Sequence, residues 1–337
     1  MRYAKGLVPG LLLGMSVAAL AYGLSQAGWA KEAGLGALTL AIVFGALIGN
    51  VFPQTGTQPF HAGLAFSQSR LLRLGVALYG FNLSAQQILQ VGKSGVLVDV
   101  LMVTTTLLCG WFVGMRLLKM ERETVILTTA GSAICGAAAV VATAPVLGVD
   151  EDSLAEKSSV AVATVVLFGT LAMLVYPLLY PWLGRVGLDF GTYVGSTVHE
   201  VAQVMAVGNA LGSEVAASAV IVKMIRVMLL IPFLLLLGTL VTARRRGAAA
   251  SRPLSVPWFA FAFVAIAGFN SLHLLPPEWV QLLRNVGQWL LAVAMVALGV
   301  GTTWQRVRRA GIRPLILGAC LFLHLVCVGG FINYLLD

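Results

Sequence analysis

Ionisable residues inside otherwise apolar stretches are the parts of this sequence most able to do chemistry, because charge in the middle of a bilayer is expensive. Lys223 and Arg226 stand three residues apart, so on a helix they share one face. Two cations on one face repel each other unless something negative lies between them or opposite, and an arginine can bind an oxyanion through two hydrogen bonds. The pair therefore predicts contact with an anion. The alternative is a structural ion pair in which Glu200 neutralises one cation.

A second polar cluster occupies the run from Gly195 to Gln203. If this run is one helix, Ser196, His199, Glu200 and Gln203 lie on one face of it. That face could bind substrate, or carry a coupling proton on His199 or Glu200. Hydrogen bonds that join helices are the structural alternative. The run is not the zinc motif His-Glu-x-x-His, because Gln203 replaces the second histidine.

Small residues gather around Gly131 and Gly136, two glycines that tolerate unwound backbone. A helix broken there would direct backbone N–H groups and a positive dipole end toward an anion, with Ser132, Cys135 and Gly136 as candidate contacts. Close packing of helices is the structural alternative. Asp99, near the start of its apolar stretch, is a further candidate for carrying a coupling ion.

Composition indicates that these residues lie in a membrane. Hydrophobic residues make up 59% of the chain and charged residues 10%, whereas soluble domains carry about 25% charged residues. We therefore expect one all-α, polytopic, membrane-embedded domain over residues 1–337, with four free cysteines and no disulfide. Runs of about 20 apolar residues predict eleven transmembrane helices, over 7–27, 34–52, 71–90, 95–117, 124–148, 158–183, 190–211, 215–242, 255–274, 282–304 and 312–336.

Basic residues orient these spans, because cytoplasmic segments carry an excess of Lys and Arg. With a cytoplasmic N-terminus, sixteen basic residues fall in inner segments, four in outer loops, and the C-terminus lies outside. The inner residues are Arg2, Lys5, Arg70, Arg73, Arg116, Lys119, Arg122, Arg185, Arg244, Arg245, Arg246, Arg252, Arg306, Arg308, Arg309 and Arg313. The outer ones are Lys31, Lys93, Lys157 and Arg284, together with the acidic loop at Asp150. The polar stretch 53–69 is expected to be a loop or an interfacial segment.

Two internal similarities indicate the duplicated halves of many transporters. Residues 80–84 resemble residues 299–303, and residues 131–136 resemble residues 195–200. The first pair lies seven spans apart and would be inverted. The second pair lies two spans apart and would be parallel, unless one member is a re-entrant hairpin.

These motifs make the sequence similar to the sulfate exporter family of YeiH-type bacterial inner-membrane proteins. The resemblance implies a fold related to the sodium/proton antiporter and bile-acid transporter group, in which a core with discontinuous helices pairs with a panel or dimerisation domain. The core would include 71–148 and 190–336, and a homodimer is expected by analogy. The family name implies export of sulfate or a related sulfur oxyanion. The matching stretches are 72–81, 131–145, 195–208, 222–228 and 292–304.

The function predicted is secondary transport of a small anion across the bacterial inner membrane, such as sulfate, another sulfur oxyanion or a sulfonate, by alternating access with a coupling proton or sodium ion. No Walker motif supplies ATP drive, and no catalytic set, cofactor, metal site or nucleic-acid partner is expected. The alternative is a cation/proton antiporter that carries its ion on Glu200 or Asp99. Two mid-span cations against one clear acid favour the anion.

Overall fold

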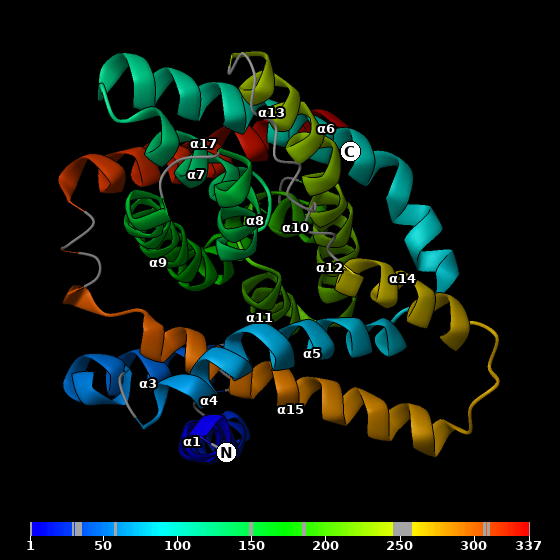
Figure 1. Cartoon of the computed structure of the whole chain (residues 1–337). Helices are drawn as coiled ribbons and strands as arrows, with labels where there is room; N and C mark the ends of the chain where they lie inside the picture. The colour runs from blue at the N-terminus through cyan, green and yellow to red at the C-terminus, as the bar shows by residue number, and fades with distance from the viewer. Residues whose placement is uncertain are drawn as a thin grey trace. The chain divides into compact units, whose positions relative to one another are not determined.

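The computed structural model describes the chain except residues 1, 29, 31–35, 57–58, 148–150, 184–186, 245–257, 306–307, 309–310 and 337. All regular elements of the described residues are helical (Figure 1). The charged residues Lys31, Asp150, Arg185, Arg245, Arg246, Arg252, Arg306 and Arg309 lie outside the described residues. All four cysteines are free, as predicted.

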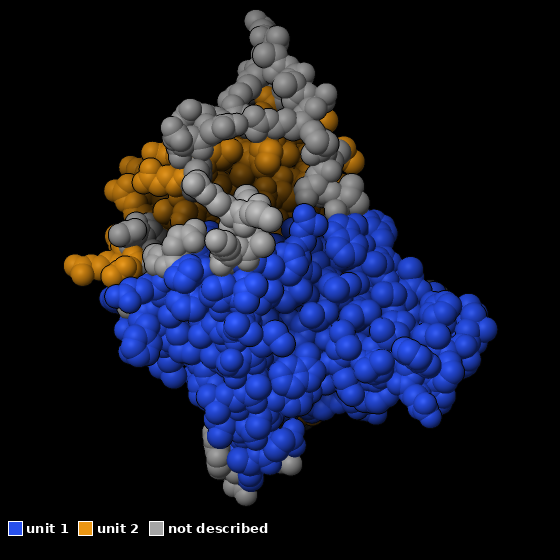
Figure 2. Space-filling view, turned by 60° about the horizontal axis from the view of Figure 1, so that its bottom comes forward, with its two compact units in different colours: residues 1–90, 202–218, 258–304 blue, residues 91–201, 219–257, 305–337 orange. Residues whose placement is uncertain are grey.

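The chain forms two compact units, blue and orange in Figure 2. Unit 1 comprises residues 1–90, 202–218 and 258–304, and unit 2 comprises residues 91–201, 219–257 and 305–337. The predicted core, 71–148 and 190–336, therefore takes residues from both units.

Unit 1 is built on close contact between α15 and its neighbours. A Cβ at Gly45 or Gly49 would lie 2.3 or 2.4 Å from a backbone oxygen of α15, so these two glycines let α3 and α15 touch along their backbones. α5 runs beside α15 (Figure 1). The main helices of unit 1 are α1 (Arg2–Ser25), α3 (Ala37–Val51), α4 (His61–Phe66), α5 (Leu72–Leu78), α14 (Trp258–Asn270) and α15 (Pro277–Gly301).

Of the two expectations for the polar run 53–69, the loop is wrong for most of its length, and the interfacial segment stays a prediction. Helical backbone starts at His61 and continues to Asn82 through a short π-helical stretch, so most of the polar run 53–69 is helical. Ser67 is buried, and its hydroxyl donates to the Gly63 carbonyl at 2.9 Å. The polar side chains there bond along their own helix or lie exposed, which is why their polarity did not mark a loop.

Unit 2 holds the interrupted helices. α6 (Ala85–Trp111), α11 (Val201–Leu211) and α12 (Ser213–Met228) carry residues of both units. The remaining helices of unit 2 are α7 (Arg122–Ala133), α8 (Ala137–Leu147), α9 (Glu151–Leu183), α10 (Phe190–Thr197), α13 (Leu230–Arg244) and α17 (Ile312–Leu336).

Six helices of the described residues are long and apolar enough to cross a membrane, and four shorter apolar helices accompany them. The multi-pass, all-helical architecture is thus confirmed. The orientation of the spans stays a prediction, and the count of eleven spans is wrong at the predicted span 124–148, where α7 and α8 form a helical hairpin. The six run over 7–25, 94–117, 156–183, 213–241, 277–301 and 312–336.

The predicted crossing over 124–148 is wrong, because α7 and α8 form a helical hairpin. Lys157 Nζ, near the start of α9, lies 2.8 Å from Glu121 Oε2 and 3.2 Å from Glu123 Oε2, next to the start of α7. Had residues 124–148 crossed the bilayer, the two ends would be about 30 Å apart. The chain therefore enters and leaves on one side, and Lys157 belongs with Arg122 rather than opposite it.

Candidate functional site

The reversal between α7 and α8 lies where the glycines predicted an interruption. α7 ends at Ala133, Ile134 leaves the helical region (φ −116°, ψ −81°), and Gly136 has φ +72°. The Gly136 N–H donates to the Gly131 carbonyl at 2.9 Å. A Cβ on Gly136 would lie 2.2 Å from Glu200 Cγ, so glycine is required here both for backbone conformation and for space.

A second interruption divides the predicted span 190–211. α10 starts at Phe190 and is capped by Asp189, whose carboxylate accepts the Gly191 N–H at 3.0 Å. Helical backbone stops at Thr197, Val198 is extended, and α11 starts at Val201.

The predicted single face of Ser196, His199, Glu200 and Gln203 is therefore wrong. Ser196 ends one helix, His199 and Glu200 lie in the break, and Gln203 lies in the first turn of the next helix. All four side chains are buried, so the prediction that they do not face lipid is confirmed, although they do not share one helical face.

Lys223 and Arg226 lie between the two interruptions and donate to backbone carbonyls of both. Lys223 Nζ donates to the carbonyls of Ile134 and Val198 at 2.8 and 2.7 Å. Both cations are fully buried. The Arg226 guanidinium donates to the carbonyls of Ser132, Ala133 and Ser196.

Those carbonyls are the unpaired ends of two helices. The last carbonyls of α7 and α10 have no partners within their own helices, and each helix end carries about half a negative charge. Lys223 and Arg226, one helical turn apart on α12, satisfy these groups and oppose both dipole ends at once. They hold two helix ends together as a hydrogen-bonded bridge.

Glu200 stands at the opposite kind of helix end. Its Oε1 accepts the N–H of Ala137, the first residue of α8, at 3.1 Å. A carboxylate is favourable at a helix N-terminus, where backbone N–H groups and the dipole are positive. Each polar end that the hairpin creates is thus matched by a side chain of opposite charge.

Asp99 is the other buried acid of unit 2. It lies on α6, is fully buried, and interacts electrostatically with Arg226 and Lys223. Gly95, one turn earlier, brings α6 against α12, since a Cβ there would lie 3.1 Å from Val222 Cγ2. Neither carboxyl oxygen of Asp99 accepts a hydrogen bond from the described residues.

Three more predicted residues stand at the interruptions. Ser132, Cys135 and His199 are buried there. Neither ring nitrogen of His199, nor the Ser132 hydroxyl, has a hydrogen-bond partner among the described residues. Gln203 is buried as well, but it belongs to unit 1.

Sequence reasoning missed two residues that support the α10 end. The Asn333 amide on α17 donates to Ser196 Oγ at 3.1 Å, and the Tyr176 hydroxyl on α9 donates to Thr197 Oγ1 at 2.9 Å. Asn333 is one amide in an otherwise apolar run, a signal that could have been read as an interhelical hydrogen bond. Nothing in the sequence distinguishes Tyr176 from an ordinary apolar contact.

The fold and the buried charges define a class, a multi-pass protein of the bacterial inner membrane with interrupted helices. A family profile described as "Conserved hypothetical protein 698" matches residues 9–318. The chain belongs to this family, UPF0324, as the YeiH-type resemblance predicted.

Three relatives illustrate the similarity. A UPF0324 membrane protein of Pseudomonas aeruginosa is 46% identical, with 98% of this chain and 94% of that protein covered. A UPF0324 membrane protein of Yersinia pestis is 45% identical, with 97% and 92% covered. The UPF0324 inner membrane protein YeiH of Escherichia coli K12 is 42% identical, with 98% and 94% covered.

Proposed function

We propose that the protein is a secondary transporter that moves a small anion by alternating access. The observation that carries the proposal is the pair of buried cations at two interrupted helices of a membrane protein. Non-helical backbone at membrane depth is tolerated only where it is buried in protein or lines a cavity, and transporters place substrate sites at such breaks.

The balance of charge favours an anion as substrate. Lys223 and Arg226 bring two positive charges to a region where two helix ends contribute about half a negative charge each. Glu200 adds a negative charge, but it stands at the positive end of α8. With a neutral Asp99 the region is therefore positive overall, and with an ionised Asp99 it is close to neutral.

This balance of charge also favours coupling of anion transport to a proton. An anion and an ionised Asp99 compete for the same positive region, so the anion binds most tightly when Asp99 carries a proton. Substrate and proton would then bind together. A sulfur oxyanion such as sulfate is the proposed substrate, because its charge and acceptor oxygens suit guanidinium and ammonium donors and helix N-termini.

The test is ligand-dependent thermal stabilisation of the purified protein, since a ligand that binds only the folded state raises the melting temperature. Sulfate, thiosulfate, taurine, chloride and sodium are compared at two pH values. Sulfate is expected to stabilise the wild type more strongly at the lower pH. Asp99→Asn, a nearly isosteric neutral variant, is expected to bind sulfate equally at both pH values.

His199→Gln is the matched control, because His199 is buried like Asp99 and neither of its ring nitrogens has a hydrogen-bond partner among the described residues. It is expected to leave the pH dependence of sulfate binding in place. Sulfate counterflow in proteoliposomes then tests transport itself. Stabilisation by sodium or pH alone, lost in Glu200→Gln, would replace the anion reading with cation/proton antiport.

A further inference from the structure

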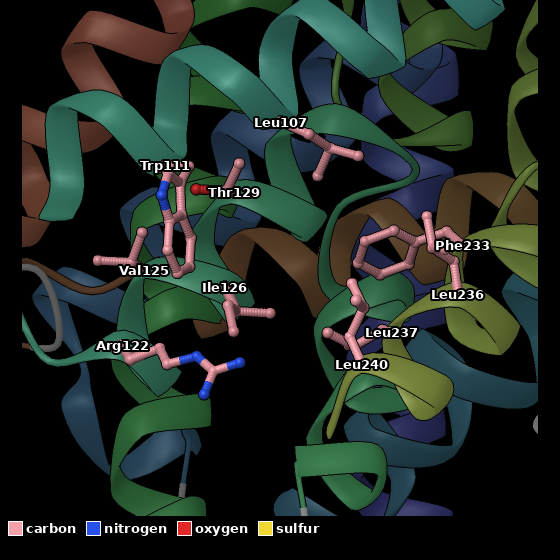
Figure 3. Close-up of a pocket in the computed structure, with 10 residues that line it drawn as sticks. All are labelled: Leu107, Trp111, Arg122, Val125, Ile126, Thr129, Phe233, Leu236, Leu237 and Leu240. Atoms are coloured by element: carbon pink, nitrogen blue, oxygen red, sulfur yellow. The ribbon is translucent and has the colours of Figure 1, made fainter. Parts of the chain in front are cut away.

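A second candidate site lies in unit 2, away from the interruptions. It is a pocket of about 400 Å³ between α6, α7 and α13 (Figure 3), a volume typical of small-molecule sites. Its walls are apolar except for one arginine and one threonine. The lining residues are Leu107, Trp111, Arg122, Val125, Ile126, Thr129, Phe233, Leu236, Leu237 and Leu240.

Arg122 gives the pocket a charged end. Figure 3 shows its side chain reaching into the pocket from α7, with Leu237 and Leu240 of α13 across from it. Its Nε is buried and has no hydrogen-bond partner among the described residues. The adjacent carboxylates Glu121 and Glu123 form their ion pairs with Lys157, at 2.8 and 3.2 Å, although Glu123 also attracts Arg122 electrostatically.

The apolar side of the pocket opens to the surface of the protein. Trp111, Leu236 and Leu240 are exposed, and so are their neighbours Leu108 and Phe112. On a membrane-embedded helix such residues face lipid, and Trp is typical of the level of the headgroups. The pocket therefore combines an apolar cavity that lipid can enter with a cation at its end, whose buried Nε has no hydrogen-bond partner among the described residues.

We propose that this pocket binds an anionic phospholipid, with an acyl chain against α6 and α13 and the headgroup phosphate on Arg122. Two further basic residues, Arg116 and Lys119, are exposed in the short connection from α6 to α7, so the charge around the headgroup favours a lipid with net negative charge. This site is independent of the proposed transport, since none of its lining residues lies at the interruptions.

The experiment measures the melting temperature of the full-length protein in neutral detergent with added phosphatidylglycerol, phosphatidylethanolamine or soluble glycerol phosphate. Phosphatidylglycerol is expected to stabilise the protein at about tenfold lower concentration than phosphatidylethanolamine, because both carry the phosphate but the ethanolamine ammonium is repelled by Arg122, Arg116 and Lys119. Glycerol phosphate is expected to have no effect. An equal shift with glycerol phosphate would mean a free anion site, and equal shifts with both lipids would overturn the preference for negative charge.

Two matched pairs of variants test the two ends of the pocket. Arg122→Gln is expected to abolish the preference for phosphatidylglycerol and Arg122→Lys to keep part of it, whereas Arg313→Gln, at an exposed arginine on α17, leaves it unchanged. Ile126→Trp fills the cavity and is expected to weaken the binding of both lipids. Leu97→Trp, at an exposed position of α6 outside the pocket, is expected to leave the binding of both lipids unchanged. Unchanged lipid binding in Arg122→Gln or in Ile126→Trp would refute the site.

Discussion

At the scale of single residues, the α7–α8 reversal depends on one glycine with two separate requirements. Gly136 has a positive φ and faces Glu200 at a distance that leaves no room for a Cβ. A non-glycine residue in such backbone costs about 1–3 kcal/mol, and the steric overlap with Glu200 adds to that cost. Glu200 cannot retreat freely, because its carboxylate accepts the N–H of Ala137.

We therefore expect Gly136→Ala to lower the melting temperature more than Gly187→Ala does. Gly187 also has a positive φ, +83°, but nothing lies within 4 Å of the position of its Cβ. The control thus isolates the cost of backbone conformation from the cost of the overlap. The measurement is thermal unfolding of both purified variants in detergent. Equal losses would show that Glu200 moves aside without cost.

At the scale of elements, α12 holds α7 and α10 together through two side chains rather than through apolar packing alone. Lys223 and Arg226 each bond to carbonyls from both helices. A buried carbonyl left without a donor costs about 1–3 kcal/mol. Because the two cations serve the same pair of helix ends, losing either one weakens the hold of the other.

Lys223→Met and Arg226→Met are each expected to lower stability, and the double variant is expected to lose less than the sum of the two. Coupling between contacting residues is typically about 0.5–3 kcal/mol. The shift in melting temperature of the two single variants and the double variant measures it. Lys157→Met with Arg226→Met is the control pair and should be additive, since Lys157 bonds to Glu121 and Glu123 instead. Additive losses at 223 and 226 would show two independent contacts.

At the scale of the whole molecule, the hairpin changes the path of the chain across the membrane. If the N-terminus is cytoplasmic, as predicted, we expect Lys157 to join Arg122 on the inner side, α9 to run from inside to outside, and Arg185 to fall on the outer side. The positive-inside bias expects the arginines at 244–246 on the inner side, so the segment 213–241 should end there. It does so only if the interrupted segment 190–211 also returns to the side that it entered. The exchange of one lysine for one arginine leaves the charge bias unchanged, which is why counting charges did not detect the error.

Cysteine labelling in intact cells tests this path, with the four native cysteines replaced. Lys119→Cys and Glu156→Cys are expected to be protected together from a membrane-impermeant thiol reagent, and Glu214→Cys to be labelled. All three positions are exposed in the structure, and labelling in permeabilised cells is the control for reactivity. Labelling of Glu156→Cys but not of Lys119→Cys would place the two positions on opposite sides of the membrane. Residues 124–148 would then cross it, and the hairpin would be refuted.

The sequence alone predicts much of the architecture. An apolar fraction of 59% requires lipid as solvent, and long apolar runs place most of the spans near their observed helices. Gly131 and Gly136 located the first interruption, because glycine is the residue that tolerates the required backbone. The similarity between 131–136 and 195–200 already allowed a re-entrant hairpin, but it did not indicate which member formed one.

The tertiary structure alone decided the path of residues 124–148 and the partners of the buried cations. A hairpin and a crossing helix have the same composition, so the reversal of the backbone at Gly136 and the ion pairs of Lys157 with Glu121 and Glu123 are needed to distinguish them. Lys223 and Arg226 predicted a negative partner, and the partners observed are backbone carbonyls at helix ends. Every residue carries a backbone carbonyl. Whether a given carbonyl lacks a helical partner depends on where its helix stops and what packs against that end, and only the folded chain shows this.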